Sequence, residues 1–209
     1  MNQSSQCLVI AGPSGAGKST IIHGALAINQ NWTFSISSTT RKMREGETDG
    51  VDYYFQGREQ FERDISSQNF LEYAEVYGNL YGTRRSEIDR ATREHKHLLI
   101  EVDTVGCLSI RAALPEIPLV AVLPPSLGEL ATRLEDRGTE TQDSLKKRLL
   151  PALAEMQRMQ AFDYVVVNDG KDQAVLDLLA IMQVVESGAH RVRQRINLIM
   201  TGSGVSNAR

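Results

Sequence analysis

The sequence predicts an α/β protein in which helices cover both faces of a mainly parallel sheet. Near-continuous runs of valine, isoleucine and leucine recur along the chain, and segments with helical spacing of apolar residues separate them. Strands that are apolar on both faces are typical of parallel sheets buried between helices. A chain of 209 residues can build one main core, with room for inserted subdomains.

The elements follow from these patterns in chain order. Short apolar runs predict strands at residues 7–12, 97–103, 118–125 and 163–169. Periodic segments between them predict helices at residues 19–30, 105–114, 126–137, 144–161 and 171–187. Between residues 35 and 92 the strands look short and half polar, as in "DYYF" and "FLEYAEVY", which predicts an inserted subdomain. Residues 135–148 are irregular and charged, and the tail from 188 to 209 has the composition of a frayed end.

The composition argues against several classes of protein. The net charge of −3 gives no general basic field for nucleic acid or an anionic membrane surface. Two cysteines in apolar surroundings predict core packing and neither a disulfide framework nor a metal cluster. The polar first residues lack a signal-peptide pattern, and no apolar run approaches membrane-spanning length. We therefore expect a reduced, cytoplasmic protein without nucleic-acid or membrane partners.

A phosphate-binding loop follows the first predicted strand. "GPSGAGKS" fits the pattern G-x-x-x-x-G-K-[ST] of a P-loop and opens a predicted helix. Its glycines let backbone N–H groups point at phosphate oxygens, and the helix presents its positive end to the same anion. Lys18 is expected to reach the β- and γ-phosphates, and Ser19 to bind Mg²⁺. The segment predicted to bind the triphosphate is Gly12, Pro13, Ser14, Gly15, Ala16, Gly17, Lys18, Ser19 and Thr20.

The polar segment "SISSTTRKMREGETDGVDYYF", residues 35–55, narrows the reaction. P-loop proteins include motors, GTPases and small-molecule kinases, and the loop alone does not separate them. Hydroxyls, two arginines, carboxylates and tyrosines in one inserted segment favour a kinase for a small anionic acceptor. Two anions must meet there, and nearby cations make their approach tolerable.

Several motifs together resemble the guanylate kinases, a P-loop family that transfers a phosphoryl group from ATP to GMP. The resemblance runs from about residue 6 to residue 187 and is carried by the P-loop, "SSTTR" (37–41) with Arg44, "GE" (46–47), "DY" (52–53), "FLEYAEVYGNLYGT" (70–83), "RLEDRG" (133–138), Arg148 and "VVND" (166–169). It implies a P-loop NTPase-type sheet, an inserted GMP-binding subdomain, a mobile lid and Mg²⁺ with ATP. The implied divisions are core (1–36), GMP-binding subdomain (37–92), core (93–134), lid (135–150), core (151–187) and C-terminal tail (188–209).

The resemblance also assigns the acceptor site. Arg41 and Arg44 match the arginines that hold the GMP phosphate, for which a planar guanidinium is well suited. Tyr53 and Tyr81 match tyrosines that reach the same phosphate, and Glu47 is expected to position the arginines. Ser37, Glu72 and Thr83 match the positions that read guanine. An ionised carboxylate only accepts hydrogen bonds, so Glu72 suits the N1 and 2-amino donors of guanine and disfavours adenine.

Two acidic residues stand at the end of the second predicted strand, where ligands bind in open α/β sheets. Glu101 and Asp103 are two residues apart and share a face, so we expect both near GMP. Asp103 suits either of two roles, reading guanine or holding a water on Mg²⁺, and the sequence does not choose between them.

The donor side is completed by residues from the later part of the chain. Arg133, Arg137 and Arg148 match ATP-side and lid arginines that neutralise the transferring phosphoryl group, and Asn168 matches an adenine contact. The residues expected to act in catalysis are Lys18, Arg41, Arg137 and Arg148. No general base is expected, because a phosphate monoester with a second pKa near ~6 is largely a dianion at neutral pH.

Two positions depart from the family pattern, and two other functions stay open. Met43 stands where the family usually has proline, and Val105 where it usually has glutamine, so catalytic efficiency is in question.

One alternative function is a catalytically inactive guanylate-kinase-like module that binds a phosphorylated peptide, although such modules usually lack an intact P-loop. The other is a P-loop kinase with a different acceptor. The tail (188–209) is a candidate for contacts between subunits.

Overall fold

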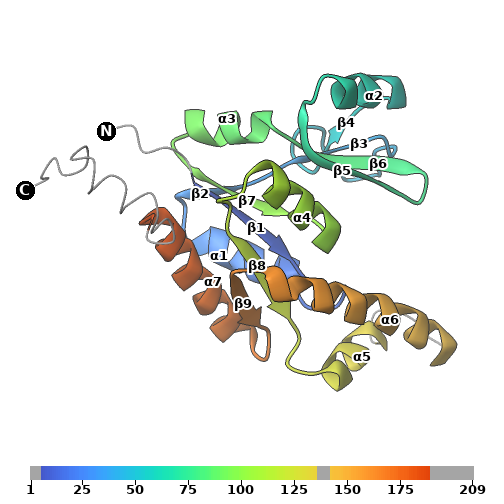
Figure 1. Cartoon of the computed structure of the whole chain (residues 1–209), viewed down its shortest axis with the longest axis vertical. Coiled ribbons are helices and arrows are strands. Elements are labelled where there is room, and N and C mark those ends of the chain that lie inside the picture. The colour runs from blue at the N-terminus through green and yellow to red at the C-terminus, as the bar shows by residue number, and fades with distance from the viewer. Residues whose placement is uncertain (1–5, 136–141, 189–209) are drawn as a thin grey trace, which may run out of the picture.

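The computed structural model of the chain contains two sheets with helices packed around them (Figure 1). It describes residues 6–135 and 142–188, with side chains for residues 6–135 and 149–188. The larger sheet forms the core, and the smaller one is built by residues between the second and seventh strands. The two sheets bring together parts of the chain that are far apart in sequence.

The core sheet has five strands in the order β2-β7-β1-β8-β9. Every neighbouring pair in it is parallel, as predicted from the apolar runs. The strands are β1 (Cys7–Ala11), β2 (Trp32–Phe34), β7 (His97–Glu101), β8 (Leu119–Leu123) and β9 (Tyr164–Val167). The four predicted strands are confirmed with bounds within two residues at either end.

Helices cover both faces of this sheet because alternate strand residues point to opposite sides. On one face Leu8 and Ile10 pack with apolar residues of α1 (Lys18–Ile28) and α7 (Lys171–Glu186). On the other face Val9 and Ala11 pack with α3 (Ser86–Arg93), α4 (Thr104–Ala113) and the 3-10 helix η1 (Met159–Ala161). Cys107 lies buried in this second layer as predicted, whereas Cys7 is only partly buried.

The second sheet has four strands in the order β4-β3-β6-β5. They are β3 (Ser37–Thr39), β4 (Tyr54–Phe55), β5 (Phe70–Val76) and β6 (Asn79–Arg84). Helix α2 (Arg58–Ser66) packs on this sheet through Phe61, whose ring stacks on Phe70 at 4.4 Å between centroids in a small core completed by Leu80. The sheet is therefore a compact unit with apolar contacts of its own.

Helices α5 (Leu127–Glu135) and α6 (Gln142–Arg158) lie between β8 and η1 in the chain. They pack against each other through Leu130, Leu134 and Ala152. In Figure 1 they lie at the lower right, while the second sheet lies at the upper right. Residues 136–141, within the predicted lid, lie outside the described residues.

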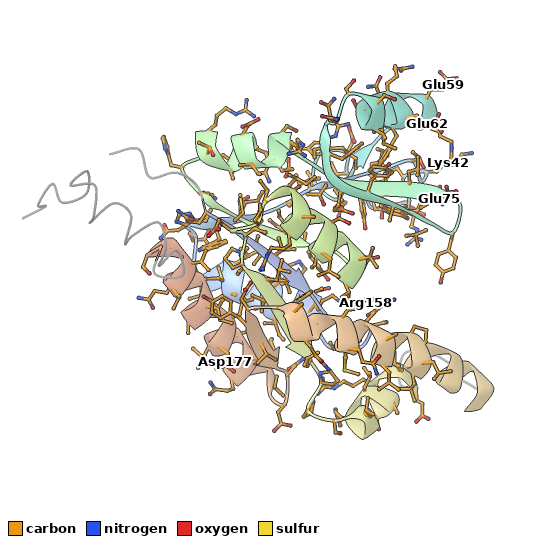
Figure 2. The ribbon with its side chains drawn as sticks, viewed as in Figure 1. Lys42, Glu59, Glu62, Glu75, Arg158 and Asp177 are labelled. Carbon is orange, nitrogen blue, oxygen red and sulfur yellow. The ribbon has the colours of Figure 1, made fainter. Side chains whose placement is uncertain are left out.

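Five elements were not predicted: β2, β3, β6, α2 and α3. β2 has only three residues, of which Trp32 alone is buried, so it gives no apolar run. α2 is mostly charged, and its Glu59 and Glu62, labelled in Figure 2 together with Glu75 of β5, are exposed. "DYYF" forms a strand only at Tyr54–Phe55. Within the described residues, no helix is both long and apolar enough to cross a membrane.

Candidate active site

A cavity of about 580 Å³ opens between the P-loop and the second sheet. Its wall includes eleven of the residues predicted as binding residues. These are Gly12, Ser14, Gly15, Gly17, Lys18, Ser19, Thr20, Ser37, Tyr53, Glu101 and Asp103. The predicted phosphate-donor loop and part of the predicted acceptor site therefore face one shared space.

The P-loop owes its shape to two glycines with left-handed backbone angles. Gly15 has φ +88° and Gly17 has φ +85°, a region that residues with a Cβ rarely adopt. Gly17 is also the N-cap of α1, so the helix begins directly at the cavity with Lys18. Pro13 and Ala16 are buried behind this wall, where the amide of Ala16 donates to the carbonyl of Pro13 at 3.1 Å.

Lys18 lies over the loop that it is expected to serve. Its Nζ donates to the carbonyl oxygen of Gly12 at 2.6 Å and stands 3.9 Å from a carboxylate oxygen of Glu101. Burial raises the pKa of Glu101, and the charge of Lys18 opposes that shift. Ser19 is exposed in the first turn of α1, beside the same cavity. The loop thus offers one ammonium, one hydroxyl and a helix N-terminus to an anion.

Arg41 is held in place by Glu47 on the second sheet's side of the cavity. Its two terminal nitrogens donate to the two carboxylate oxygens of Glu47, at 3.0 and 2.7 Å. The hydrogen bonds from Arg41 lower the pKa of Glu47 to about 2, and the pair raises the pKa of Arg41. The guanidinium carbon lies 5.3 Å from the ring centroid of Tyr53, and Tyr81 lies edge-on to Tyr53 at 6.0 Å. The predicted phosphate-binding side chains other than Arg44 therefore form one cluster.

Arg44 contributes differently from Arg41. Its main-chain N–H donates to Glu47 at 2.8 Å, while its side chain is exposed. Glu47 thereby contacts the loop at both arginines, and its positioning role stays a prediction. Met43, at the position where the family usually has proline, is 54% exposed and packs no core.

Glu72 and Thr83 meet across the β5–β6 pair. Both the main-chain N–H and the hydroxyl of Thr83 donate to Oε1 of Glu72, at 3.0 and 2.7 Å. Ser37 on β3 is in register with Thr83, which brings the three predicted base-reading residues together. Burial raises the pKa of Glu72, and the hydrogen bonds from Thr83 oppose that shift. The second oxygen of Glu72 lies close to Gly106, where an added Cβ would stand 3.2 Å from it.

Asp103 lines the cavity and also stabilises the start of α4. It is the N-cap of α4, and its Oδ1 accepts a 2.7 Å hydrogen bond from the N–H of Gly106. A Cβ added at Gly106 would also lie 3.3 Å from this oxygen, so Glu72 and Asp103 converge on the same glycine. Both alternatives for Asp103, guanine reading and the magnesium hydration shell, stay open.

Asn168 lies behind the P-loop at the end of β9. Its Nδ2 donates to the carbonyl oxygen of Ala16 at 2.8 Å, and a Cβ on Gly17 would clash with it. Arg133 donates from one terminal nitrogen to the carbonyl oxygen of Asn168 at 3.0 Å and from Nε to Glu129 at 2.8 Å. Arg133 and Asn168, both predicted on the ATP side, therefore touch each other, and the adenine contact of Asn168 stays a prediction.

Two predicted arginines cannot be placed in this site. Arg137 lies outside the described residues, and the side chain of Arg148 is outside the described side chains. Their catalytic roles, and the lid that contains them, stay predictions.

The cavity wall also contains residues that were not predicted as site residues. They are Phe34, Ser35, Asp52, Val102 and Glu155. Phe34 ends β2 and Ser35 follows it, and β2 itself gave no signal. Glu155 is one of many charged residues on a long helix. Asp52 stood in the quoted "DY" motif, which was a usable signal. Burial raises the pKa of Glu155, and the nearby charge of Lys18 opposes that shift.

Comparisons with known proteins identify the family. The family model described as guanylate kinase matches residues 4–185. The chain is 41% identical over 194 residues to a guanylate kinase of Symbiobacterium thermophilum, covering 93% of this chain and 91% of the relative. It is 42% identical over 192 residues to one of Thermus thermophilus, covering 92% of this chain and 87% of the relative.

A solved structure agrees with these sequence relatives. The crystal structure of guanylate kinase from Anaplasma phagocytophilum superposes with a TM-score of 0.70 at 29% identity, covering 97% of each chain. The match extends over the core, the second sheet and the P-loop, because it spans nearly the whole length of both chains. The chain belongs to the guanylate kinase family.

Proposed function

We propose that the two sides of the cavity hold the two substrates of the guanylate kinase reaction, ATP at the P-loop and GMP at the second sheet. The observation that carries this proposal is the shared wall of the cavity. Lys18 and Ser19 of the P-loop face the same space as Ser37 and Tyr53 of the second sheet. Such a space lets two phosphates approach each other away from bulk water.

The donor phosphates are assigned to the P-loop and the start of α1. Main-chain N–H groups and the helix N-terminus attract anions there, and Lys18 adds a full positive charge. When triphosphate binds, Lys18 exchanges its hydrogen bond to the carbonyl of Gly12 for phosphate oxygens. Arg133 and Asn168 support the loop from behind, and the adenine contact of Asn168 belongs to this assignment.

The acceptor phosphate is assigned to Arg41, Arg44, Tyr53 and Tyr81. Arg41 is already oriented by Glu47 and stands beside the Tyr53 ring, so little ordering is needed when the phosphate binds. Arg44 is exposed and closes onto the phosphate from the loop side. Two guanidinium groups and two phenols match the oxygens of a phosphate dianion.

Guanine is assigned to Ser37, Glu72 and Thr83, with Glu101 and Asp103 at the cavity wall beyond them. Thr83 occupies one oxygen of Glu72 with two hydrogen bonds, which leaves the other oxygen for the N1 and 2-amino donors of guanine. Adenine has an acceptor at N1, so it would face an acceptor-only carboxylate. A wrong base would leave buried polar groups unpaired, which permits discrimination of ~10⁴.

The residues at the donor site fit a magnesium ion that arrives with ATP. Mg²⁺ keeps several waters and is usually held by substrate phosphates with one or two protein oxygens, and Ser19 offers one exposed hydroxyl beside Lys18. Among the described residues, no group of three or more histidines, cysteines and carboxylates could hold a metal by itself. When bound, Mg²⁺ neutralises charge on the β- and γ-phosphates.

The reaction then needs positioning and charge neutralisation. A phosphate oxygen of GMP forms the new bond to the γ-phosphorus, and the bond from that phosphorus to the β–γ bridging oxygen breaks, giving GDP and ADP. The attacking oxygen carries no proton at neutral pH, because the second pKa of a phosphate monoester is near ~6. Lys18 and Arg41 stabilise the negative charge from the donor and acceptor sides.

A panel of acceptors tests this assignment. We expect ADP release in a coupled assay to be fast with GMP and dGMP, much slower with IMP, which lacks the 2-amino donor, and near background with AMP and UMP. A protein that binds a phosphorylated peptide without catalysis would release no ADP in response to GMP. A preference for AMP or a phosphosugar would instead identify a kinase with another acceptor.

Three further expectations from the sequence are kept as part of this proposal. The cytoplasmic location and the absence of nucleic-acid partners stay predictions. Contact between subunits through the tail also stays a prediction, because residues 189–209 lie outside the described residues.

A further inference from the structure

The chain passes between the two sheets twice, and a buried carboxylate joins the two crossings. The first crossing runs from the end of β2 at Phe34 to the start of β3 at Ser37, and the second leaves β6 through α3 to β7. Glu87 lies in α3 and its side chain is 1% exposed. Its Oε2 accepts a 2.8 Å hydrogen bond from the main-chain N–H of Ile36 in the first crossing.

Arg90 ties this carboxylate to the core sheet. Its guanidinium donates to Glu87 at 2.7 Å and, from the same nitrogen, to the carbonyl oxygen of Phe34 at 2.7 Å. Another nitrogen reaches the hydroxyl of Thr33 at 3.3 Å. The hydrogen bond to Glu87 raises the pKa of Arg90, so the guanidinium stays charged. The carboxylate is therefore fixed to β2 through a charged partner.

Tyr54 ties the same carboxylate to the second sheet. Its hydroxyl donates to Oε1 of Glu87 at 3.0 Å. Burial is the main reason why the pKa of Tyr54 is raised, and this hydrogen bond raises it further. The guanidinium of Arg84 lies over the Tyr54 ring at 5.4 Å and donates to the hydroxyl of Ser38 at 2.6 Å. Glu87 is thus bonded at once to the crossing, to the core sheet through Arg90, and to the second sheet.

We propose that Glu87, paired with Arg90, sets the position of the second sheet relative to the P-loop sheet and thereby aligns the two substrates. Glu87 does not line the cavity, whereas Phe34, Ser35 and Ser37 of the crossing that it holds do. It is therefore a positioning residue that acts through the crossing. The inference rests on the proposed assignment of ATP to one sheet and GMP to the other.

The physical consequence is a separation between binding and transfer. Each nucleotide alone contacts mainly its own sheet, so its affinity depends little on where the other sheet stands. Transfer requires the reacting atoms to be held about 3–3.5 Å apart, and a misplacement of about 1 Å can cost about 100-fold in rate. A ligand that occupies both sites has the same sensitivity, because its second contact requires the correct spacing.

The experiment uses Glu87→Gln, Tyr54→Phe and a matched control, Glu94→Gln, in the full chain. Glu94 is the exposed partner of the same Arg90, at 3.1 Å, and does not touch the crossing. Calorimetry gives the Kd of ATP and of GMP separately. The same measurement is made with a two-site ligand in which adenosine and guanosine are joined 5′ to 5′ by five phosphates, and kcat is measured by ADP release.

For Glu87→Gln we expect kcat and the affinity for the two-site ligand each to fall by about tenfold or more, with the separate Kd values within about twofold of the unchanged protein. Tyr54→Phe should show the same pattern more weakly, and Glu94→Gln should show no change. A loss of affinity for GMP alone as large as the loss for the two-site ligand would overturn the proposal, since Glu87 would then only shape the acceptor site. Unchanged kcat and two-site affinity would overturn it too.

The design separates this inference from the function on which it rests. If Glu87→Gln does not fold, the Tyr54→Phe variant tests the proposal by itself, because it removes one hydrogen bond and leaves the buried ion pair. Unchanged kcat and unchanged affinity for the two-site ligand in Tyr54→Phe would then contradict the proposal. If the unchanged protein failed to phosphorylate GMP, the assigned reaction would be wrong, whereas a normal rate with the variant pattern absent would contradict only the role of Glu87.

Discussion

Asn168 and Ala16 are joined by a hydrogen bond of 2.8 Å, from the side-chain amide of the first to the carbonyl oxygen of the second. The contact places a side chain from the end of β9 directly behind the P-loop. Because Gly17 has no Cβ, Asn168 can lie against the loop without a clash. The position of Asn168 thus bears on phosphate binding as well as on the adenine contact that the resemblance implies.

This relationship predicts the effect of Asn168→Ala. The variant loses one hydrogen bond worth about 1 kcal/mol and the support that this bond gives the loop. We therefore expect the Kd of ATP to rise by about tenfold. Inorganic tripolyphosphate has no base. If Asn168 acts mainly by supporting the P-loop, the Kd of tripolyphosphate should rise by the same factor as the Kd of ATP, and calorimetry measures both. Asp172→Asn, an exposed change in the first turn of α7, serves as the control. Weaker ATP binding with unchanged tripolyphosphate binding would show that adenine recognition is the main role.

Glu47→Gln tests the orientation of Arg41. Glutamine cannot accept two charge-assisted hydrogen bonds, so we expect the KM for GMP to rise on the order of tenfold while the KM for ATP stays within about twofold. Steady-state kinetics with each substrate varied in turn measures this. Equal increases in both KM values would contradict an acceptor-side role.

The same variant gives a pH dependence of stability. The pKa of Glu47 is lowered from 4.5 to about 2 in the folded protein. Its pairing therefore stabilises the fold fully above pH 4.5, and this contribution is lost as the pH falls from 4.5 towards 2. Urea unfolding of the unchanged protein and of Glu47→Gln should differ most near neutral pH and converge in the acid range. A difference that grows on acidification would contradict the assignment.

Glu72→Gln tests guanine recognition and its protonation. Burial raises the pKa of Glu72 above its ordinary value of 4.5. On acidification its carboxylate is therefore protonated, and stops accepting from guanine, at a higher pH than the carboxylate of an exposed glutamate. We expect the KM for GMP to rise on acidification in the unchanged protein. In Glu72→Gln it should be raised by about 1,000-fold or more at neutral pH.

The control for this pH dependence comes from the same pair of proteins. GMP itself takes up a proton near pH ~6, and that contribution is common to both. The ratio of the two KM values should therefore shrink as the pH falls, because only the unchanged protein loses its carboxylate. A ratio that does not depend on pH would mean that Glu72 is not the titrating group.

Arg44→Ala tests the exposed arginine of the acceptor loop. Because its guanidinium is exposed in this structure, we expect no loss of stability and a rise of at least about tenfold in the KM for GMP. The KM for ATP should stay within about twofold. Lys42→Ala changes an exposed cation two residues away, labelled in Figure 2, and should leave both constants unchanged. Equal loss on both substrates would contradict the assignment of Arg44 to GMP.

Local patterns in the sequence were enough for four of the five strands of the core sheet and for most of its covering helices. The strands β1, β7, β8 and β9 are apolar on both faces, so each gives a run that is visible without knowledge of its neighbours. The P-loop was equally visible, since its glycines and Lys18 act within eight residues of chain. The motifs of the second sheet were found by resemblance and gave its residues without its strand order.

Several elements gave too little local signal to be found. β2 and β3 have only three residues each, and β2 pairs with a single neighbouring strand at the edge of the core sheet. α2 and α3 bury so few side chains that their stability depends on the surfaces beneath them. These elements therefore form only when the rest of the chain packs against them.

The sequence by itself determined the reaction class, because the motifs that mark the family depend on residue type and short spacing, and it named candidates for most of the binding side chains. Only the tertiary structure decided how the two sites face each other. Glu87 illustrates the difference: its sequence position on a polar helix predicts an ordinary surface charge, yet it is buried between Ile36, Tyr54 and Arg90. Ile36 and Tyr54 lie 51 and 33 residues away along the chain, and these two contacts exist only after both sheets have formed and packed together.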